Sequence, residues 1–198
     1  GYGSANLDLG IQINSQTVFN LGSISKQFLA AGILHASLSG HLSLDDDIRK
    51  WIPEFPDYGH PITIRHLVHH TSGIRDEAQL RAVGNLPDDL SRTGIIELLC
   101  RQQALNFIPG EKWLYSNGGY LLLEEILERA TGQGVHQYLF QVFFRPLDLS
   151  SAYYGRYRGV VPNASTSYVP KQEIFQRDSH VADVAGIRIN SQDMAKWM

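Results

Sequence analysis

The stretch FNLGSISKQF, residues 19–28, marks the point where the chain changes from an extended to a helical pattern. Before it, apolar and polar residues alternate over residues 7–13 (LDLGIQI), which is the period of a strand with one buried face. After Ser23 the apolar residues recur at helical spacing, and Gly40 is placed to end that helix. The sequence therefore predicts a strand, a turn at Gly22 and a helix that begins near Ser23.

Most of the chain that follows has helical patterns. The expected helices cover residues 62–70 (ITIRHLVHH), 93–105 (TGIIELLCRQQAL), 120–132 (YLLLEEILERATG) and 135–144 (VHQYLFQVFF), with a short one at 45–52 and a last one from Ser191. The same pass finds few strong strand candidates that could pair with the opening strand. An isolated strand is marginal in water, so we expect either partner strands that the pattern hides or a chain that is part of a longer protein.

Composition excludes several classes of function. The chain has 198 residues, 43% hydrophobic and 19% charged, with a formal net charge of −3, which gives no electrostatic case for nucleic acid or a membrane surface. The longest apolar runs, such as YLLL at 120–123, are too short to span a bilayer. Cys100 is the single cysteine, so no internal disulfide can form, and we expect it to be a buried small hydrophobe.

Ser23 and Lys26 are the first candidates for chemistry. Three residues apart on a helix, they lie on the same face, so the lysine amine can hydrogen-bond the serine hydroxyl and help to activate it as a nucleophile. The plainer interpretation makes Ser23 a helix cap. It leaves Lys26 unexplained, because the positive end of a helix disfavours a cation in the first turn.

Tyr115 and Asn117, in the sequence YSN, form the second candidate group. They stand directly before a predicted helix, behind a loop shaped by Pro109 and Gly110. In the structural interpretation Asn117 caps the helix and Tyr115 is a core aromatic residue. In the functional one, the Tyr115 hydroxyl exchanges a proton with the nucleophile, and the Asn117 amide meets a substrate carbonyl.

SISK at 23–26 and YSN at 115–117, with the text between and after them, resemble the serine β-lactamase and penicillin-binding-protein superfamily. The nearest branch by this resemblance is that of class C β-lactamases with their esterase and D-aminopeptidase relatives. Further similar stretches are GHLSLDDDIRKWIPEFP (40–56), ITIRHLVHHTSGI (62–74), PGEKWLYSNGGYLLLEEILERATG (109–132), YLFQVFFRPLDLSSAYY (138–154) and AGIRINSQDMAKWM (185–198).

The resemblance implies an α+β fold, a helical region packed against an antiparallel sheet, with Ser23 at the start of the central helix. It implies a serine hydrolase that forms an acyl-enzyme with a β-lactam, a D-amino-acid peptide or a small ester, without a cofactor or metal. Ser23 would be acylated, Lys26 and Tyr115 would handle its proton, and Asn117 would position the substrate. It also favours a periplasmic or secreted location, although no signal peptide is visible.

One departure from the family pattern matters. The family has a third motif, Lys-Thr-Gly or His-x-Gly, on a strand that also supplies an oxyanion-hole amide, and no such triplet follows residue 132. We therefore expect residues 1–198 to be one β-lactamase-like domain that lacks its C-terminal part: a strand region (1–22), a mainly helical region (23–150) and a return toward the sheet (151–198). Such a chain should be a slow enzyme, and its unpaired strand edge should favour homo-oligomers.

Three other interpretations are open at this stage. His66 and His70 have the i, i+4 spacing of a zinc-binding helix, with His69 beside them, but no glutamate follows His66 and no third ligand is evident. A Ser-His-Asp triad has eight histidines available, but LGSIS lacks the second glycine of a nucleophile elbow. A non-catalytic relative would bind a peptide or partner in the same cleft.

Overall fold

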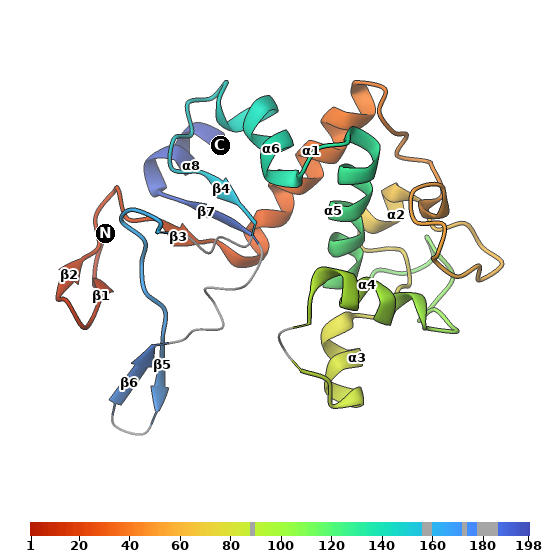
Figure 1. Ribbon diagram of the computed structural model, residues 1–198, viewed down its shortest axis with the longest axis horizontal. Coiled ribbons are helices and arrows are strands. Elements are labelled where there is room, and N and C mark those ends of the chain that lie inside the picture. Colours follow the sequence, from red (N-terminus) through yellow and green to blue (C-terminus); the bar gives the residue numbers. More distant parts are fainter. Residues whose placement is uncertain (88–89, 156–159, 172–173, 178–185) are drawn as a thin grey trace. The chain divides into compact units, whose positions relative to one another are not determined.

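The computed structural model describes residues 1–87, 90–155, 160–171, 174–177 and 186–198. The chain divides into two compact units, Gly1–Phe28 with Val135–Met198, and Leu29–Gly134 (Figure 1). The structure defines the packing within each unit. In the part of the chain so described, no helix combines the length and the apolar character needed to cross a membrane.

A three-stranded antiparallel sheet forms the centre of the first unit, in the order β3-β7-β4 (Figure 1). Its strands are β3 (Phe19–Asn20), β7 (Ile187–Ile189) and β4 (Tyr153–Tyr154). The middle strand is fully buried, with Phe19 opposite Ile189 and Tyr153 opposite Arg188. The sheet and the helices together confirm the predicted α+β class. The partners of β3 in this sheet thus come from sequence more than 130 residues downstream, where the pattern had shown no clear strand.

The predicted strand over residues 7–13 is wrong. The chain instead makes a small hairpin of β1 (Ser4–Asn6) and β2 (Ile11–Gln12), joined by a turn over residues 7–10. Asn6 Oδ1 accepts a hydrogen bond from the Leu9 N–H at 2.9 Å, and Gly10 has a φ of 64°. Leu7, Leu9 and Ile11 are exposed and Ile13 is half-buried, so the alternation of this segment reflects no buried face.

A second hairpin, β5 (Tyr168–Lys171) with β6 (Ile174–Arg177), was not foreseen from the sequence. It contacts the turn of the first hairpin through Asp8. The Tyr168 hydroxyl donates to Asp8 Oδ2 at 2.6 Å, and Arg177 Nε lies 2.8 Å from the same oxygen. The Tyr168 hydroxyl and the Arg177 guanidinium lower the pKa of Asp8.

Helices beside the sheet complete the first unit. They are α6 (Val135–Leu139), which continues into a π-helical turn η3 (Phe140–Phe144), and α8 (Ser191–Trp197), which confirms the helix expected from Ser191. Phe28 is fully buried here, with its ring stacked 4.3 Å from that of Trp197 and edge-on at 6.2 Å to that of Phe144. Helix α1 (Lys26–Leu38), which contains Phe28, is therefore anchored to this unit at its first turn.

The second unit is helical. It contains α2 (Ile64–Val68), α3 (Glu77–Gly84), α4 (Arg92–Cys100), α5 (Asn117–Thr131) and the 3-10 turn η2 (Ile48–Lys50). Helix α5 ends as predicted at Gly132, whose φ of 68° suits the left-handed cap that glycine adopts without strain. Its buried face supplies much of the core, with four fully buried side chains, Leu122, Leu123, Ile126 and Leu127.

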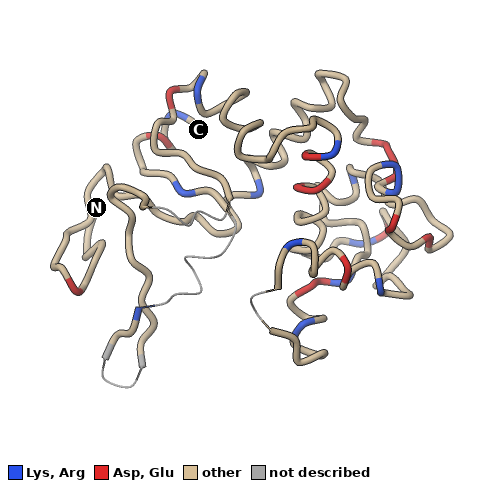
Figure 2. The backbone as a smooth tube through the Cα atoms, in the orientation of Figure 1, with Lys and Arg blue, Asp and Glu red and all other residues tan. Residues whose placement is uncertain are grey.

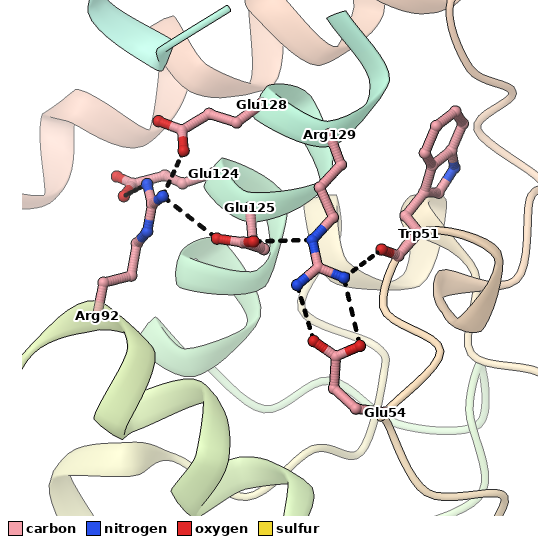
Figure 3. A network of polar contacts seen from close by, with 7 residues as sticks. All are labelled: Trp51, Glu54, Arg92, Glu124, Glu125, Glu128 and Arg129. Atoms are coloured by element: carbon pink, nitrogen blue, oxygen red, sulfur yellow. Dashed lines mark hydrogen bonds and ion pairs between the residues drawn. The ribbon is translucent and has the colours of Figure 1, made fainter. Parts of the chain in front are cut away.

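A network of ion pairs joins α4, α5 and the segment at residues 51–54 (Figure 3). Arg92 of α4 pairs with Glu124, Glu125 and Glu128 of α5. Arg129 Nη2 lies 2.7 Å from Glu54 Oε1, its Nε lies 2.8 Å from Glu125 Oε1, and its Nη1 donates to the Trp51 carbonyl at 2.8 Å. Figure 2 shows both acidic and basic positions on the second half of α5.

Candidate active site

Ser23 lies on the exposed 3-10 turn η1 (Gly22–Ser25), immediately before α1. Lys26, the first residue of α1, is half-buried, and its Nζ donates to Ser23 Oγ at 3.4 Å. The predicted contact between the two side chains is therefore present. The residue in the cap position of η1 is Leu21, and no side chain caps this end, so Ser23 is not the cap of η1.

The serine between them fixes this turn to the sheet. Ser25 is buried, and its Oγ accepts a hydrogen bond from the Ile187 N–H of β7 at 2.7 Å while donating to the Gly22 carbonyl. A Cβ at Gly186 would lie only 2.7 Å from the same oxygen. Ser25 thus ties the turn that carries Ser23 to the central strand, a role that no local pattern around Ser25 predicts.

The YSN residues begin α5. Ser116, buried, caps the helix, and its Oγ accepts a hydrogen bond from the Gly119 N–H at 3.1 Å. Asn117 is the first residue of the helix, so the expectation that it is the cap is wrong by one position. Tyr115 is 36% exposed, which contradicts the interpretation of its ring as a core aromatic.

His70 holds the chain on the N-terminal side of α5. Its Nδ1 accepts a hydrogen bond from the Ser116 N–H at 3.2 Å, and its carbonyl accepts one from the Leu114 N–H at 2.9 Å. Its ring centroid lies 4.5 Å from that of Tyr115. His70 itself has a φ of 57°, an uncommon backbone conformation for a residue with a Cβ. His70 therefore supports both the ring of Tyr115 and the backbone on either side of it.

Asp76 contacts Asn117, the last residue of the YSN sequence. It is 8% exposed, and its Oδ2 accepts hydrogen bonds from the Asn117 N–H at 2.8 Å and from Asn117 Nδ2 at 3.4 Å. Its Oδ1 accepts from the Ala78 N–H at 3.1 Å and so caps α3. The sequence analysis did not single out Asp76. An aspartate before the helix-forming run EAQLRA is a signal that could have identified the cap, but not the contact with Asn117.

The histidines that the zinc interpretation used make backbone hydrogen bonds instead. His66 Nδ1 accepts one from the Thr63 N–H at 3.2 Å, as part of a capping box at the start of α2. Burial lowers the pKa of His66. Among the residues that the structure describes, no group of three or more His, Cys, Asp or Glu side chains is placed to hold a metal ion.

Ser23 and Lys26 belong to the first unit, and Tyr115 and Asn117 belong to the second. The contacts of each pair are described within its own unit. That the Tyr115 hydroxyl meets the Ser23–Lys26 pair stays a prediction from the sequence.

Known proteins are similar to this chain in both sequence and fold. A family model described as Beta-lactamase matches residues 1–198. A penicillin-binding protein of Bacillus subtilis (strain 168) is 32% identical over 151 residues, covering 75% of this chain and 33% of the relative. Esterase EstB of Burkholderia gladioli is 32% identical over 162 residues, covering 74% of this chain and 41% of the esterase.

Two solved structures superimpose on nearly the whole chain at 25% identity. The octameric penicillin-binding protein homologue from Pyrococcus abyssi has a TM-score of 0.85, covering 100% of this chain and 47% of its own. The β-lactamase/D-alanine carboxypeptidase from Pseudomonas syringae has a TM-score of 0.78, covering 99% and 54%. The chain thus spans about a third to two fifths of the length of the two curated relatives. Because the family model matches from the first residue to the last, the chain belongs to the Beta-lactamase family.

Proposed function

We propose that this chain carries the acylation centre of a serine hydrolase, with Ser23 as the nucleophile. The observation that carries the proposal is the 3.4 Å contact between Lys26 Nζ and Ser23 Oγ on an exposed turn. A serine hydroxyl is a weak nucleophile until a neighbouring group takes its proton. Lys26 and Tyr115 would handle that proton, and Asn117 would hold the substrate.

In the proposed reaction, Ser23 Oγ attacks the carbonyl carbon of an amide or ester, and its proton passes to the Lys26–Tyr115 pair. The tetrahedral intermediate collapses with cleavage of the bond to the leaving group, which departs with the proton. A water molecule then hydrolyses the Ser23 ester, releasing the acid and restoring the hydroxyl. Both steps place negative charge on the former carbonyl oxygen, so the rate depends on donors fixed at that position.

The substrate class includes strained and unstrained acyl compounds: a β-lactam, a D-amino-acid peptide or a small ester. The names of the relatives span the same range, since they include a penicillin-binding protein, an esterase and a β-lactamase/D-alanine carboxypeptidase. The chain covers only part of each of these relatives, so an experiment must choose among the three substrate classes.

The test is covalent labelling with a fluorophosphonate probe, followed by intact-mass spectrometry and peptide mapping. We expect one adduct on Ser23 in the wild-type chain and none in Ser23→Ala. Ser39→Ala, which removes an exposed serine at the end of α1, is the matched control and should label like the wild type.

The outcomes separate the competing functions. An adduct on a different serine would contradict the proposal and favour a triad of another kind. No adduct on a folded chain would favour a non-catalytic relative that binds a peptide or partner. Labelling that is lost only in Ser23→Ala supports the proposal, and competition by a β-lactam or by p-nitrophenyl acetate then ranks the substrates.

A further inference from the structure

We propose that Asp76 is a positioning residue that orients the Asn117 amide toward the substrate. The inference rests on the proposed function, because Asn117 matters to the reaction only if Ser23 is acylated. Asp76 would touch neither the substrate nor the nucleophile. It would act through Asn117 alone.

Asp76 makes two hydrogen bonds to Asn117, one to its backbone and one to its side chain. Its Oδ2 accepts from the backbone N–H of Asn117 at 2.8 Å and from the side-chain Nδ2 at 3.4 Å. The first bond fixes where the Asn117 backbone starts α5, and the second favours one side-chain rotamer and one orientation of the amide. A side chain held at two points retains less rotamer freedom than one that points into solvent.

The carboxylate also suits its surroundings. Asp76 is the N-cap of α3 and lies against the first N–H of α5, so one anion faces the positive ends of two helices. Hydrogen bonds from N–H groups to an ionised carboxylate are roughly twice as strong as neutral ones. With 8% of its surface exposed, Asp76 is also shielded from competing water.

Glu77, the next residue, is a second buried carboxyl in this cluster. Glu77 is 6% exposed, and its Oε2 has no hydrogen-bond partner among the described residues. Burial and the neighbouring Asp76 carboxylate raise the pKa of Glu77, which favours the neutral acid there. A Cβ on Gly118 would lie 3.5 Å from Glu77 Oε2, so the Glu77 carboxyl packs against the first turn of α5.

Two substitutions separate the capping of α3 from the hold on Asn117. In Asp76→Ser, the hydroxyl is a good helix cap, so α3 should keep its start, but the shorter side chain cannot also reach Asn117. In Asp76→Asn, the shape and one acceptor oxygen remain without the charge. If Asp76 acts by orienting Asn117, the asparagine variant should recover part of what the serine variant loses.

The kinetic test is a double-mutant cycle on the second-order rate constant for labelling of Ser23. We expect Asp76→Ser to slow labelling by about 10- to 100-fold, since misplacing a positioning group by about 1 Å costs rates of this order. In the Asn117→Ala background the same change should cost less than about twofold, because the group through which Asp76 acts is already gone. A general structural role predicts that the two losses multiply, and that result would overturn the proposal.

A spectroscopic test does not depend on catalysis. In a ¹⁵N–¹H spectrum the Asn117 side-chain amide is identified as the pair of signals missing from Asn117→Ala. We expect Asp76→Ser to move this pair toward the shifts of solvent-exposed amides, with Asp76→Asn in between. Signals that do not move would overturn the positioning role, whatever the labelling shows. Wild-type chain that fails to label on Ser23 would instead overturn the proposed function. The two failures are told apart because the movement of the Asn117 amide signals in Asp76→Ser does not depend on labelling.

Discussion

Gly73 offers the sharpest test of how the second unit is built. It has a φ of +72°, and a Cβ at this position would lie 2.2 Å from the Phe107 carbonyl oxygen and 3.2 Å from its carbon. Both atoms are backbone, so no side chain can rotate away to make room. The segment also holds the loop before Tyr115, since the Asn106 N–H donates to the Gly73 carbonyl at 2.7 Å.

Gly59 is a matched control within the same unit. Its φ is +75°, almost the same as that of Gly73, but a Cβ there would meet nothing within 4 Å. Alanine at either position carries the left-handed conformational penalty of roughly 1–2 kcal/mol, partly offset by a gain of about 0.4–1 kcal/mol from the restricted unfolded chain. We therefore expect Gly59→Ala to lower the free energy of unfolding by about 1 kcal/mol.

Gly73→Ala should lower the free energy of unfolding much further. Relief of the contact requires the backbone at Phe107 to move, which adds roughly 1–3 kcal/mol, and loss of the Asn106 hydrogen bond adds about 1 kcal/mol. The expected total is about 3–5 kcal/mol. Urea unfolding followed by tryptophan fluorescence, with linear extrapolation, measures both variants. Equal losses in the two variants would refute the reasoning, because the close approach to Phe107 and the hydrogen bond from Asn106 are both expected to add to the loss in Gly73→Ala.

Three further changes test the site and its surroundings. Lys26→Arg should abolish labelling of Ser23 while the circular dichroism spectrum stays unchanged, because the arginine side chain stays protonated and has a larger planar head group. Near-normal labelling would show that Lys26 does not take part in the reaction. Glu77→Gln should stabilise the protein at pH 8 but not near pH 4. The pKa of Glu77 is raised in the native state, so the stability that its bound proton provides is lost as pH rises above the unfolded value of 4.5. A gain in the free energy of unfolding that is equal at both pH values, measured in urea, would contradict this. Cys100 is half-buried rather than buried as expected, and this partial burial raises the pKa of its thiol to about 11. It should react with iodoacetamide at pH 8 about 100-fold more slowly in the native chain than in urea, and equal rates would contradict its partial burial in α4.

The sequence alone determined the elements whose signals are local. Helix α5 was predicted because a cap, an apolar stripe and Gly132 follow one another within a short stretch, and each acts on its immediate neighbours. The contact of Ser23 with Lys26 is equally local, since three residues along a helical turn bring the side chains onto one face. The family resemblance, now confirmed by the match over residues 1–198, also came from ordered motifs.

Local patterns failed where a distant partner decides the conformation. Alternation over residues 7–13 looked like a strand, but Leu7, Leu9 and Ile11 are exposed and the chain turns over residues 7–10. The short strand Ile187–Ile189 carried too weak a pattern to be seen, although it pairs with β3 and β4 and is fully buried. A strand of three residues gains its stability from its neighbours, so its own sequence says little.

The supports of the candidate site were decided by tertiary structure alone. Ser25 meets the Ile187 N–H across 162 positions, His70 meets the Ser116 N–H across 46, and Asp76 meets Asn117 across 41. None of these pairs has a spacing that a helix or strand would bring together. Sequence periodicity indicates which residues share a face of one helix or strand. These hydrogen bonds instead join separate elements that burial of the core brings together, because polar groups buried there need hydrogen-bond partners.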